Sequence, residues 1–392
     1  MFLVDQPYVS KILKETLRDH DIPVVGSEAA LSFDLLPGTR IISEEQAAEL
    51  ASRDTGLRVY TNSENAIGWI SRQTGFSKLS EKIDLFKDKL KFRDLTRPLF
   101  PEFRYTALQL EELRSVSLED LPLPFIIKPT VGFFSMGVYR VSNRSEWATA
   151  IDAIHQEIDL LKDVYPEEVY NAGTFIVEQC IEGEEFAVDA YFDAAGEPVI
   201  LSILKHAFSS EADVSDRVYT TSRDIIERNL SEFTTFIAGI GALADVRRFP
   251  VHVELRRDAK GNLLPIEVNP LRFGGWCTTA DISLMAFGFN PYLLYYNQER
   301  PDWTDALKGT DGKLFSIVVL DNSTGIASDR IISFDDGKLQ AGFEKPLAFR
   351  KIDFHQYPVF GFLFAETRVD NYAELQAILD SDLKEFVKTT GN

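Results

Sequence analysis

The sequence predicts an α/β protein of several domains, in which strands and helices alternate. Residues 2–75 combine short apolar runs, such as FLV, PVV and LRVY, with amphipathic stretches such as YVSKILKETLRDH. This alternation is typical of a small α/β domain. From Phe125 the pattern changes to paired strands separated by polar turns. Because 392 residues also exceed the length at which a single core usually stops growing, we expect two or three domains.

These changes in pattern suggest boundaries. We expect an N-terminal α/β domain at residues 1–85, a central domain at 86–305 and a C-terminal α/β lobe at 306–392. Within the central domain, a lid is expected at about 97–174 and a core at 175–305. Amphipathic periodicity predicts helices at 80–95, 222–245 and 373–387. The first of these leads past Pro98 and Pro101 into the connection to the lid.

Composition and charge exclude several classes of protein. The chain is 45% hydrophobic and has a formal net charge of -20. Such a charge argues against nucleic-acid binding or an anionic membrane surface, because both require positive protein surface. No apolar stretch approaches the ~18 to 20 residues of a membrane helix. We therefore expect a folded, soluble protein without nucleic-acid or membrane partners.

Cysteine use and the N-terminus indicate the compartment. Cys180 and Cys277 are the two cysteines of the sequence, and they form neither a disulfide framework nor a CxxC metal motif. The opening apolar residues, Met1 to Val4, are too few for a signal peptide and lack a basic flank. A reducing environment fits best, so we expect a cytoplasmic location.

A hairpin near residue 260 brings acidic side chains together. If AKGN forms a four-residue turn, Asp258 pairs with Leu263, and counting outward places Glu254 directly opposite Glu267. Asn269 then lies on the same face, because side chains alternate along a strand. Opposed carboxylates repel unless a cation neutralises them, and two carboxylates with an amide oxygen suit magnesium. A solvated surface hairpin is the alternative.

The sequence around this hairpin favours a binding site. Glu267 and Asn269 lie between apolar strand residues and a Pro/Gly loop, LLPIEVNPLRFGG. The loop carries Arg272, whose guanidinium is suited to binding a phosphate or carboxylate beside the metal.

Five ordered motifs resemble the ATP-grasp superfamily, and the resemblance extends from about Asp88 to Asn297. They are DK at 88–89, KPTVGFFSMGV at 128–138, VEQCIEGEEF at 177–186, VHVEL at 251–255 and PIEVNPLRFGG at 265–275. The resemblance implies an ATP-grasp fold, in which the first 85 residues precede the ATP-grasp domain. It also implies ATP and Mg²⁺ as ligands, with one or two ions in the site and Mn²⁺ as a possible substitute.

The phosphate-binding candidates lie around the second motif. Lys128 ends a strand beside a loop that contains Ser135 and Gly137, and backbone N–H groups of such a loop can cradle phosphate oxygens. The segment matches neither GxxxxGK[ST] nor GxGxxG. The resemblance implies a mobile lid here, and it assigns Lys89 as a second phosphate-binding lysine. A solvated lysine is the alternative for Lys89.

The third motif carries the expected nucleotide contacts. The resemblance implies that backbone groups around Cys180 and Ile181 bind the adenine edge. It further assigns Glu178 to the adenine amino group and Glu185 to the ribose hydroxyls. The Cys180 side chain itself is expected to be a small hydrophobic strand residue without chemical activity.

Three further residues are candidates for contacts with the triphosphate or the substrate. Lys205 and His206 end the strand EPVILSILKHAF, and Arg217 follows in a polar loop. Arg217 is suited to gripping the substrate on closure, and Arg272 is a candidate for the same role. A structural histidine and an ordinary surface arginine are the alternatives for His206 and Arg217.

The resemblance also implies a reaction. ATP-grasp ligases transfer the γ-phosphoryl group to a carboxylate and let an amine attack the acylphosphate. We therefore expect an ATP-dependent ligase that joins a small-molecule carboxylate to an amine and releases ADP and phosphate. Lys128 and Arg272 are the expected catalytic residues, since this chemistry depends on positioning and charge. A phosphotransferase acting on a hydroxyl and a non-catalytic ATP-binding module remain alternatives, and a homodimer is compatible with the resemblance.

Overall fold

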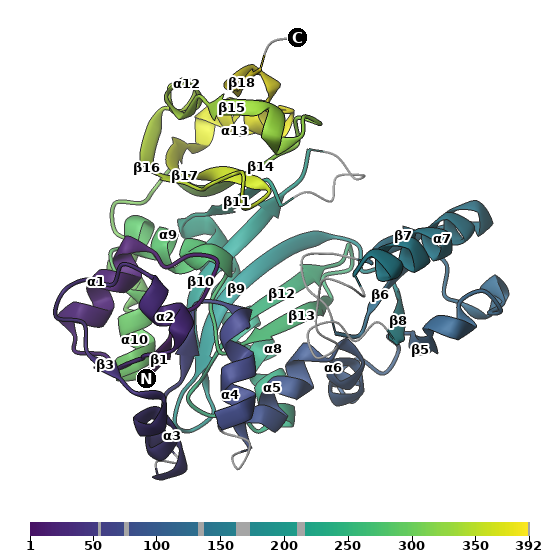
Figure 1. Cartoon of the computed structure of the whole chain (residues 1–392), viewed down its shortest axis with the longest axis horizontal. Helices are drawn as coiled ribbons and strands as arrows, with labels where there is room; N and C mark the ends of the chain where they lie inside the picture. The colour runs from purple at the N-terminus through teal and green to yellow at the C-terminus, as the bar shows by residue number, and fades with distance from the viewer. Residues whose placement is uncertain (54–55, 74–77, 132–136, 162–172, 210–215, 391–392) are drawn as a thin grey trace.

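The protein has a long central sheet with three smaller units attached to it (Figure 1). A computed structural model describes residues 1–53, 56–73, 78–131, 137–161, 173–209 and 216–390. The N-terminal unit, the lid and the C-terminal lobe lie at different edges of the central sheet (Figure 1). The mixed α/β class expected from the sequence is therefore confirmed.

The N-terminal unit is a four-stranded parallel sheet with the order β3-β2-β1-β4. Its strands are very short and are buried except at Ile41, and helices connect them. These elements are β1 (Phe2–Leu3), α1 (Lys11–Asp19), β2 (Val24–Val25), α2 (Glu28–Ser32), β3 (Ile41–Ile42), α3 (Glu44–Arg53), β4 (Tyr60–Thr61), the 3₁₀ turn η1 (Glu64–Ala66) and α4 (Ile67–Gln73).

The helix predicted at 80–95 is two helices, α5 (Leu79–Lys87) and α6 (Lys89–Thr96). They separate at Asp88, which has an extended backbone and whose carboxylate accepts hydrogen bonds from the N–H groups of Leu90 and Lys91. This is an N-cap, which starts a new helix at Lys89 and provides hydrogen-bond acceptors for the first N–H groups of that helix. The amphipathic period runs through both helices and therefore did not reveal the break.

The lid is a four-stranded antiparallel sheet with the order β5-β8-β6-β7, covered by one long helix. Trp147, Ile151 and Ile154 of that helix are buried against the sheet. Strand β8 pairs within this sheet, although the predicted boundary at 174/175 assigned it to the core. The elements are β5 (Tyr105–Gln109), β6 (Phe125–Pro129), β7 (Tyr139–Val141), α7 (Arg144–Leu161) and β8 (Thr174–Gln179).

The central sheet has eight antiparallel strands in the order β13-β12-β9-β10-β11-β14-β17-β16. It continues across residue 305, so the C-terminal lobe shares a sheet with the core. Its strands are β9 (Glu184–Phe192), β10 (Pro198–Ala207), β11 (Val218–Thr221), β12 (Phe249–Arg257), β13 (Leu263–Pro270), β14 (Lys313–Asp321), β16 (Lys345–Lys351) and β17 (Val359–Arg368). Sheets extend across two of the predicted boundaries, 174/175 and 305/306. The division into domains remains a prediction.

The helix predicted at 222–245 is α8 (Arg223–Ala244), whereas the predicted terminal helix is shorter than expected. Helix α13 (Ala373–Leu379) ends well before residue 387, and Leu383 then adopts a positive φ. The last strand among the described residues is β18 (Val387–Thr389), which pairs with β15 (Ile331–Phe334). The remaining helices are α9 (Thr278–Phe287), α10 (Pro291–Asn297), α11 (Trp303–Ala306) and α12 (Asp336–Gln340).

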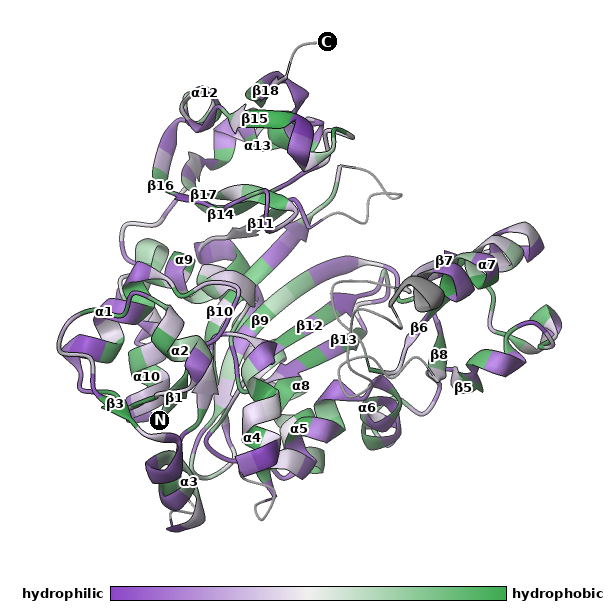
Figure 2. Ribbon diagram, in the orientation of Figure 1, coloured by the Kyte–Doolittle hydropathy of each residue, from purple (hydrophilic) through white to green (hydrophobic). Residues whose placement is uncertain are grey.

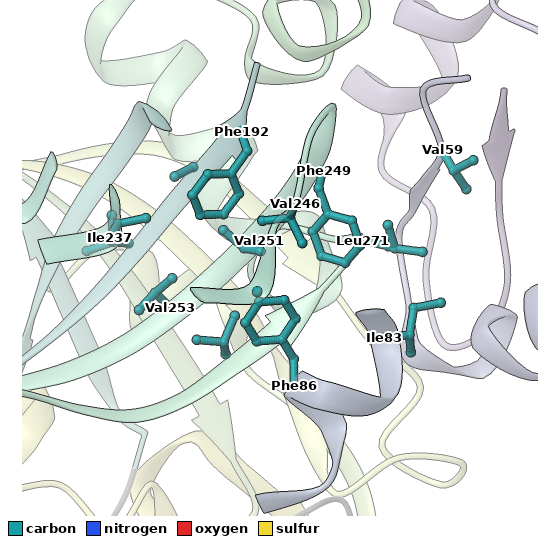
Figure 3. Close-up of a cluster of buried hydrophobic side chains, with 14 of the residues drawn as sticks. Val59, Ile83, Phe86, Phe192, Ile237, Val246, Phe249, Val251, Val253 and Leu271 are labelled. Carbon is teal, nitrogen blue, oxygen red and sulfur yellow. The ribbon is translucent and has the colours of Figure 1, made fainter. Parts of the chain in front are cut away.

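The largest hydrophobic core lies between one face of the central sheet and the helices that cover it (Figure 3). Val251 and Val253 of β12 point into this core, as does Phe192 of β9. Phe86 of α5 packs against Phe249 with ring centroids 5.8 Å apart. The core therefore fixes α5, and with it the start of α6, against the β12–β13 hairpin.

Hydrophobic and hydrophilic residues alternate within most elements, as Figure 2 shows. Among the described helices, none has the length and apolar character that crossing a membrane requires.

Packing of α8 against the sheet gives a test of this core. A Cβ at Gly241 would lie 2.0 Å from the ring of buried Phe192, so Gly241→Ala should lower the free energy of unfolding by about 1 to 3 kcal/mol. Gly239 is the matched control in the same helix, since its Cβ would meet Leu99 at 3.4 Å. Gly239→Ala should be neutral or stabilising by up to about 1 kcal/mol. Urea unfolding measures both, and equal effects would contradict the close packing.

Candidate functional site

The predicted pairing of Glu254 with Glu267 is present, although the register of the strands between the turn and this pair differs from the predicted one. Arg257, and not Asp258, pairs with Leu263, so the ladder starts one residue out of the predicted register. A register shift between Glu254 and Leu255 then restores the pairing, and by count it leaves Ile266 as the extra residue. The two departures cancel, and the carboxylates still oppose each other.

The turn explains the first departure. It spans five residues, 258–262, and the Asp258 N–H donates to the Asn262 carbonyl over 3.0 Å. The Asp258 carboxylate also accepts from the N–H groups of Lys260 and Asn262, each over 2.8 Å. Gly261 supplies the positive φ, 86°, that this wider turn needs.

The two opposed glutamates differ in their electrostatics. Burial and the charge of Glu267 raise the pKa of Glu254 well above its ordinary value. Burial has the same effect on Glu267, but the positive charges of Lys89 and Lys128 outweigh it and lower the pKa of Glu267. The pKa values of the two glutamates are therefore shifted in opposite directions, upward at Glu254 and downward at Glu267.

Asn269 and a histidine complete this face of the hairpin. Asn269 Nδ2 donates to Glu267 Oε1 over 3.1 Å. His252 pairs with Asn269 in the ladder, and its Nδ1 lies 2.7 Å from Asp189 Oδ1. Its Nε2 lies 3.7 Å from Glu254 Oε1. Sequence reasoning missed His252 and Asp189, although the spacing of VHVEL already placed the histidine on the same face as Glu254.

The donor set of this hairpin is oxygen-rich. Among the described residues, no three His, Cys, Asp or Glu side chains gather into a metal site. The two glutamates and Asn269 remain the predicted ligands. Carboxylate and amide oxygens are donors that suit Mg²⁺, which fills its other positions with water or phosphate.

Lys128 is held at the junction of the lid and the core. Its Nζ lies 2.5 Å from Glu178 Oε1, and Arg93 Nε donates to Glu178 Oε2 over 2.8 Å. All three side chains are buried. Burial alone would raise the pKa of Glu178, but the two cations lower it to about 2. Both Glu178 oxygens are occupied here, and its expected adenine contact remains a prediction.

Arg272 is held by a residue of the N-terminal unit. Its guanidinium lies 2.9 Å from Glu64 Oε1, while Lys87 Nζ lies 2.6 Å from Glu64 Oε2. Burial opposes ionisation of Glu64, but the charges of Arg272 and Lys87 lower its pKa to about 2. Sequence reasoning missed Glu64, since a polar turn in a separate unit gave no signal of contact with residue 272.

A second buried cluster surrounds Glu185. Its Oε1 lies 2.9 Å from His206 Nδ1, and its Oε2 accepts from Arg256 Nε over 2.8 Å. Arg256 also donates to the carbonyl of Ile181. The His206 ring stacks on Tyr219 with centroids 4.2 Å apart. The structure thus brings Glu185, His206 and Ile181 together, whereas the ribose and adenine contacts are untested.

The remaining candidates are distributed more widely. Cys180 is half-buried, and burial raises the pKa of its thiol, in keeping with an inert side chain. Gly137 has a positive φ of 69°, while Ser135 lies outside the described residues. Lys205 pairs in register with Phe186 and contacts Glu184 over 2.5 Å, so it lies on the opposite face of the sheet from Glu254.

Arg217 lies toward the C-terminal lobe. Its guanidinium contacts Asp321 over 2.9 Å and donates to Ser323 Oγ over 2.7 Å. The structure therefore does not bring Arg217 to the hairpin carboxylates.

The arrangement defines a class of protein. Lys89 begins α6 and Lys128 lies on the lid strand β6, and the positive charges of both lower the pKa of Glu267 in the β12–β13 hairpin. A lid sheet above a long antiparallel sheet, with lysines and acidic residues facing between them, is the ATP-grasp fold.

Comparison with known proteins agrees. Residues 121–280 match the family model described as the ATP-grasp domain, so the chain contains an ATP-grasp domain and the resemblance seen in the sequence is confirmed. No curated protein gives a significant match along the sequence.

Solved structures with the same fold cover the whole chain. An L-amino acid ligase from Bacillus licheniformis superposes with a TM-score of 0.69 at 18% identity, over 100% of this chain and 98% of that one. N5-carboxyaminoimidazole ribonucleotide synthetase from Thermotoga maritima gives 0.62 at 14%, over 100% and 99%. Phosphoribosylglycinamide synthetase from Anaerococcus prevotii gives 0.60 at 14%, over 100% and 99%. At such identities the likeness establishes the fold.

The buried Glu178 carboxylate predicts an acid-sensitive junction. Its pKa falls from 4.5 to about 2 on folding, so its stabilisation is present above about pH 4.5 and is lost as the pH falls towards 2. The full contribution is about 3 kcal/mol. Glu178→Gln should lower the free energy of unfolding by about that amount at pH 7, and the difference from wild type should shrink in acid.

Glu184→Gln is the control for this measurement. It removes an exposed contact with Lys205 and should cost less than about 1 kcal/mol. Denaturant unfolding between pH 7 and pH 2.5 measures both variants. A Glu178→Gln deficit that does not change with pH would contradict the ion-pair origin of the stability.

Proposed function

We propose that the protein is an ATP-dependent ligase that activates a small-molecule carboxylate as an acylphosphate and joins it to an amine. The observation that carries the proposal is the opposed pair Glu254 and Glu267, with Lys89 and Lys128 charge-coupled to Glu267. The match of residues 121–280 to the ATP-grasp domain supports ATP as the phosphoryl donor. Ligation is supported by the fold shared with an enzyme described as an L-amino acid ligase.

Glu254, Glu267 and Asn269 are the proposed ligands of Mg²⁺. The fit rests on the donor set and on the raised pKa of Glu254, because a divalent cation relieves the repulsion between the two carboxylates. The bound cation supplies charge neutralisation at the phosphates. We propose that the site binds one or two ions, and Mn²⁺ accepts the same oxygen ligands.

The proposed reaction proceeds in two steps. A carboxylate oxygen of the substrate attacks the γ-phosphorus of ATP, and the bond to ADP breaks. The amine nitrogen then attacks the acyl carbon, phosphate leaves, and the nitrogen loses a proton. Lys89, Lys128 and Arg272 are proposed to stabilise the charge that develops on the phosphoryl oxygens, while Lys128 and Arg272 act as the catalytic residues.

Several other assignments belong to this proposal. Cys180, Ile181, Glu178 and Glu185 are the proposed nucleotide contacts, and Gly137 of the lid is a proposed phosphate contact, as is Ser135, which is outside the described residues. His206 and Arg217 are proposed only as substrate contacts. The protein acts on small molecules in the cytoplasm, which agrees with a net charge of -20 and with two cysteines that form no disulfide.

The hairpin carboxylates provide the direct test. Glu267→Gln removes the charge that faces Lys89 and Lys128, so the rate of ATP consumption should fall about 100-fold or more at fixed Mg²⁺. Glu81→Gln, on the exposed surface of α5, is the matched control and should leave the rate unchanged. Release of ADP and phosphate is measured across paired carboxylates and amines.

Identification of the products by mass spectrometry decides the reaction type. A condensed amide or peptide product that forms only when acid, amine and ATP are all present supports the ligase. A stable phosphorylated product without condensation contradicts it and identifies a phosphotransferase. ATP binding without turnover by the wild type contradicts an enzymatic function.

A further inference from the structure

Arg93 is buried where helix α6, the lid sheet and the β12–β13 hairpin meet. Its side chain is 3% exposed and bonds to three acceptors. Nε donates to Glu178 Oε2 over 2.8 Å, one terminal nitrogen to the Pro265 carbonyl over 2.6 Å, and the other to the Ile266 carbonyl over 3.1 Å. The proposed chemistry assigns no role to this side chain.

The two carbonyls belong to the bulge that sets the hairpin register. Pro265 is the last residue in the shifted part of the ladder, and Ile266 is the extra residue. Without the bulge, Glu254 would lie opposite Ile266, and Glu267 would turn to the apolar face of the sheet. The guanidinium of Arg93 therefore bonds the backbone at the point on which the position of Glu267 depends.

The opposite side of Arg93 reaches the lid. Glu178 accepts from Arg93 with one oxygen and contacts Lys128 with the other, over 2.5 Å. This carboxylate therefore holds the ammonium group of Lys128, which lies on the lid strand β6. Arg93 thus contacts the backbone beside one proposed metal ligand and, through Glu178, a proposed phosphate-binding lysine.

We propose that Arg93 is a positioning residue that sets the relative placement of Glu267 and Lys128, and so couples cation binding to phosphate binding. The inference rests on the proposed function, since it takes these two residues as the cation and phosphate ligands. It requires an arginine, because the planar fork reaches one carboxylate and two carbonyls at once and also stacks 4.5 Å from the Phe103 ring.

A lysine at this position separates the two parts of the role. Arg93→Lys keeps a positive charge for Glu178 but loses the fork that spans both carbonyls. We therefore expect the Lys128 contact to persist while the bulge loosens. Arg93→Met loses both parts, so its effects should be larger than those of Arg93→Lys.

The experiment measures Mn²⁺ binding by electron paramagnetic resonance, with and without a non-hydrolysable ATP analogue. Arg93→Lys should weaken the Mn²⁺ affinity about 10-fold or more, which is the scale seen when partners of metal ligands are removed. Hydrogen exchange of the peptide 263–270 should become faster in the same variant. Arg97→Met, at the exposed C-cap residue that follows α6, is the matched control and should change neither measurement.

The outcomes separate the inference from the proposed function. Wild-type Mn²⁺ affinity in a folded Arg93→Lys protein overturns the inference and leaves the proposed function intact. If Arg93→Met does not fold, Arg93→Lys alone decides. A wild-type protein that binds neither Mn²⁺ nor the ATP analogue overturns the proposed function, and the inference fails with it.

Discussion

Repulsion between two carboxylates is the constraint on which the rest of the site depends. Glu254 and Glu267 face each other across one rung of a β-ladder, where opposed side chains are only ~5 Å apart at Cβ. The two carboxylates lie in different electrostatic surroundings. The positive charges of Lys89 and Lys128 lower the pKa of Glu267, whereas burial and the charge of Glu267 raise the pKa of Glu254. The pKa values of the two carboxylates are therefore shifted in opposite directions.

Two of the cations near this pair, Lys128 and Arg272, are each held by a carboxylate from another part of the chain. Glu178 holds Lys128 together with Arg93, and Glu64 holds Arg272 together with Lys87. Buried ion pairs are costly to desolvate, so they are weak evidence for stability on their own. Their value here lies in geometry, because each glutamate fixes the direction of two cations. The lid and the N-terminal unit are both tied to the core in this way.

Sequence periodicity could predict what depends on local pattern and alternation. It placed Glu254 opposite Glu267, yet the count succeeded because a wide turn and a bulge offset each other. The residues AKGN indicate neither the wide turn nor the bulge. The turn is set by the Asp258 carboxylate, which precedes them, and the bulge lies at Ile266. Lys205 was predicted as a contact of the triphosphate, but it lies on the face of the sheet opposite Glu254. Periodicity does not say which face of a strand points to the site. The partners of Glu178 and Glu64 depend on tertiary contacts over long sequence separations.

The central sheet explains why these residues converge. Glu185, Asp189, His252, Glu254 and Arg256 occupy alternating positions of β9 and β12, and the ladder registers place them on one face. The intervening residues, such as Val188, Val253 and Leu255, belong to the hydrophobic core on the other face. A slip of one residue would exchange the two sets, moving charges into the core and apolar side chains into the site. The bulge at Ile266 prevents this exchange in β13, which is an edge strand of the central sheet. The register of β13 therefore serves both the stability of the core and the chemistry of the site.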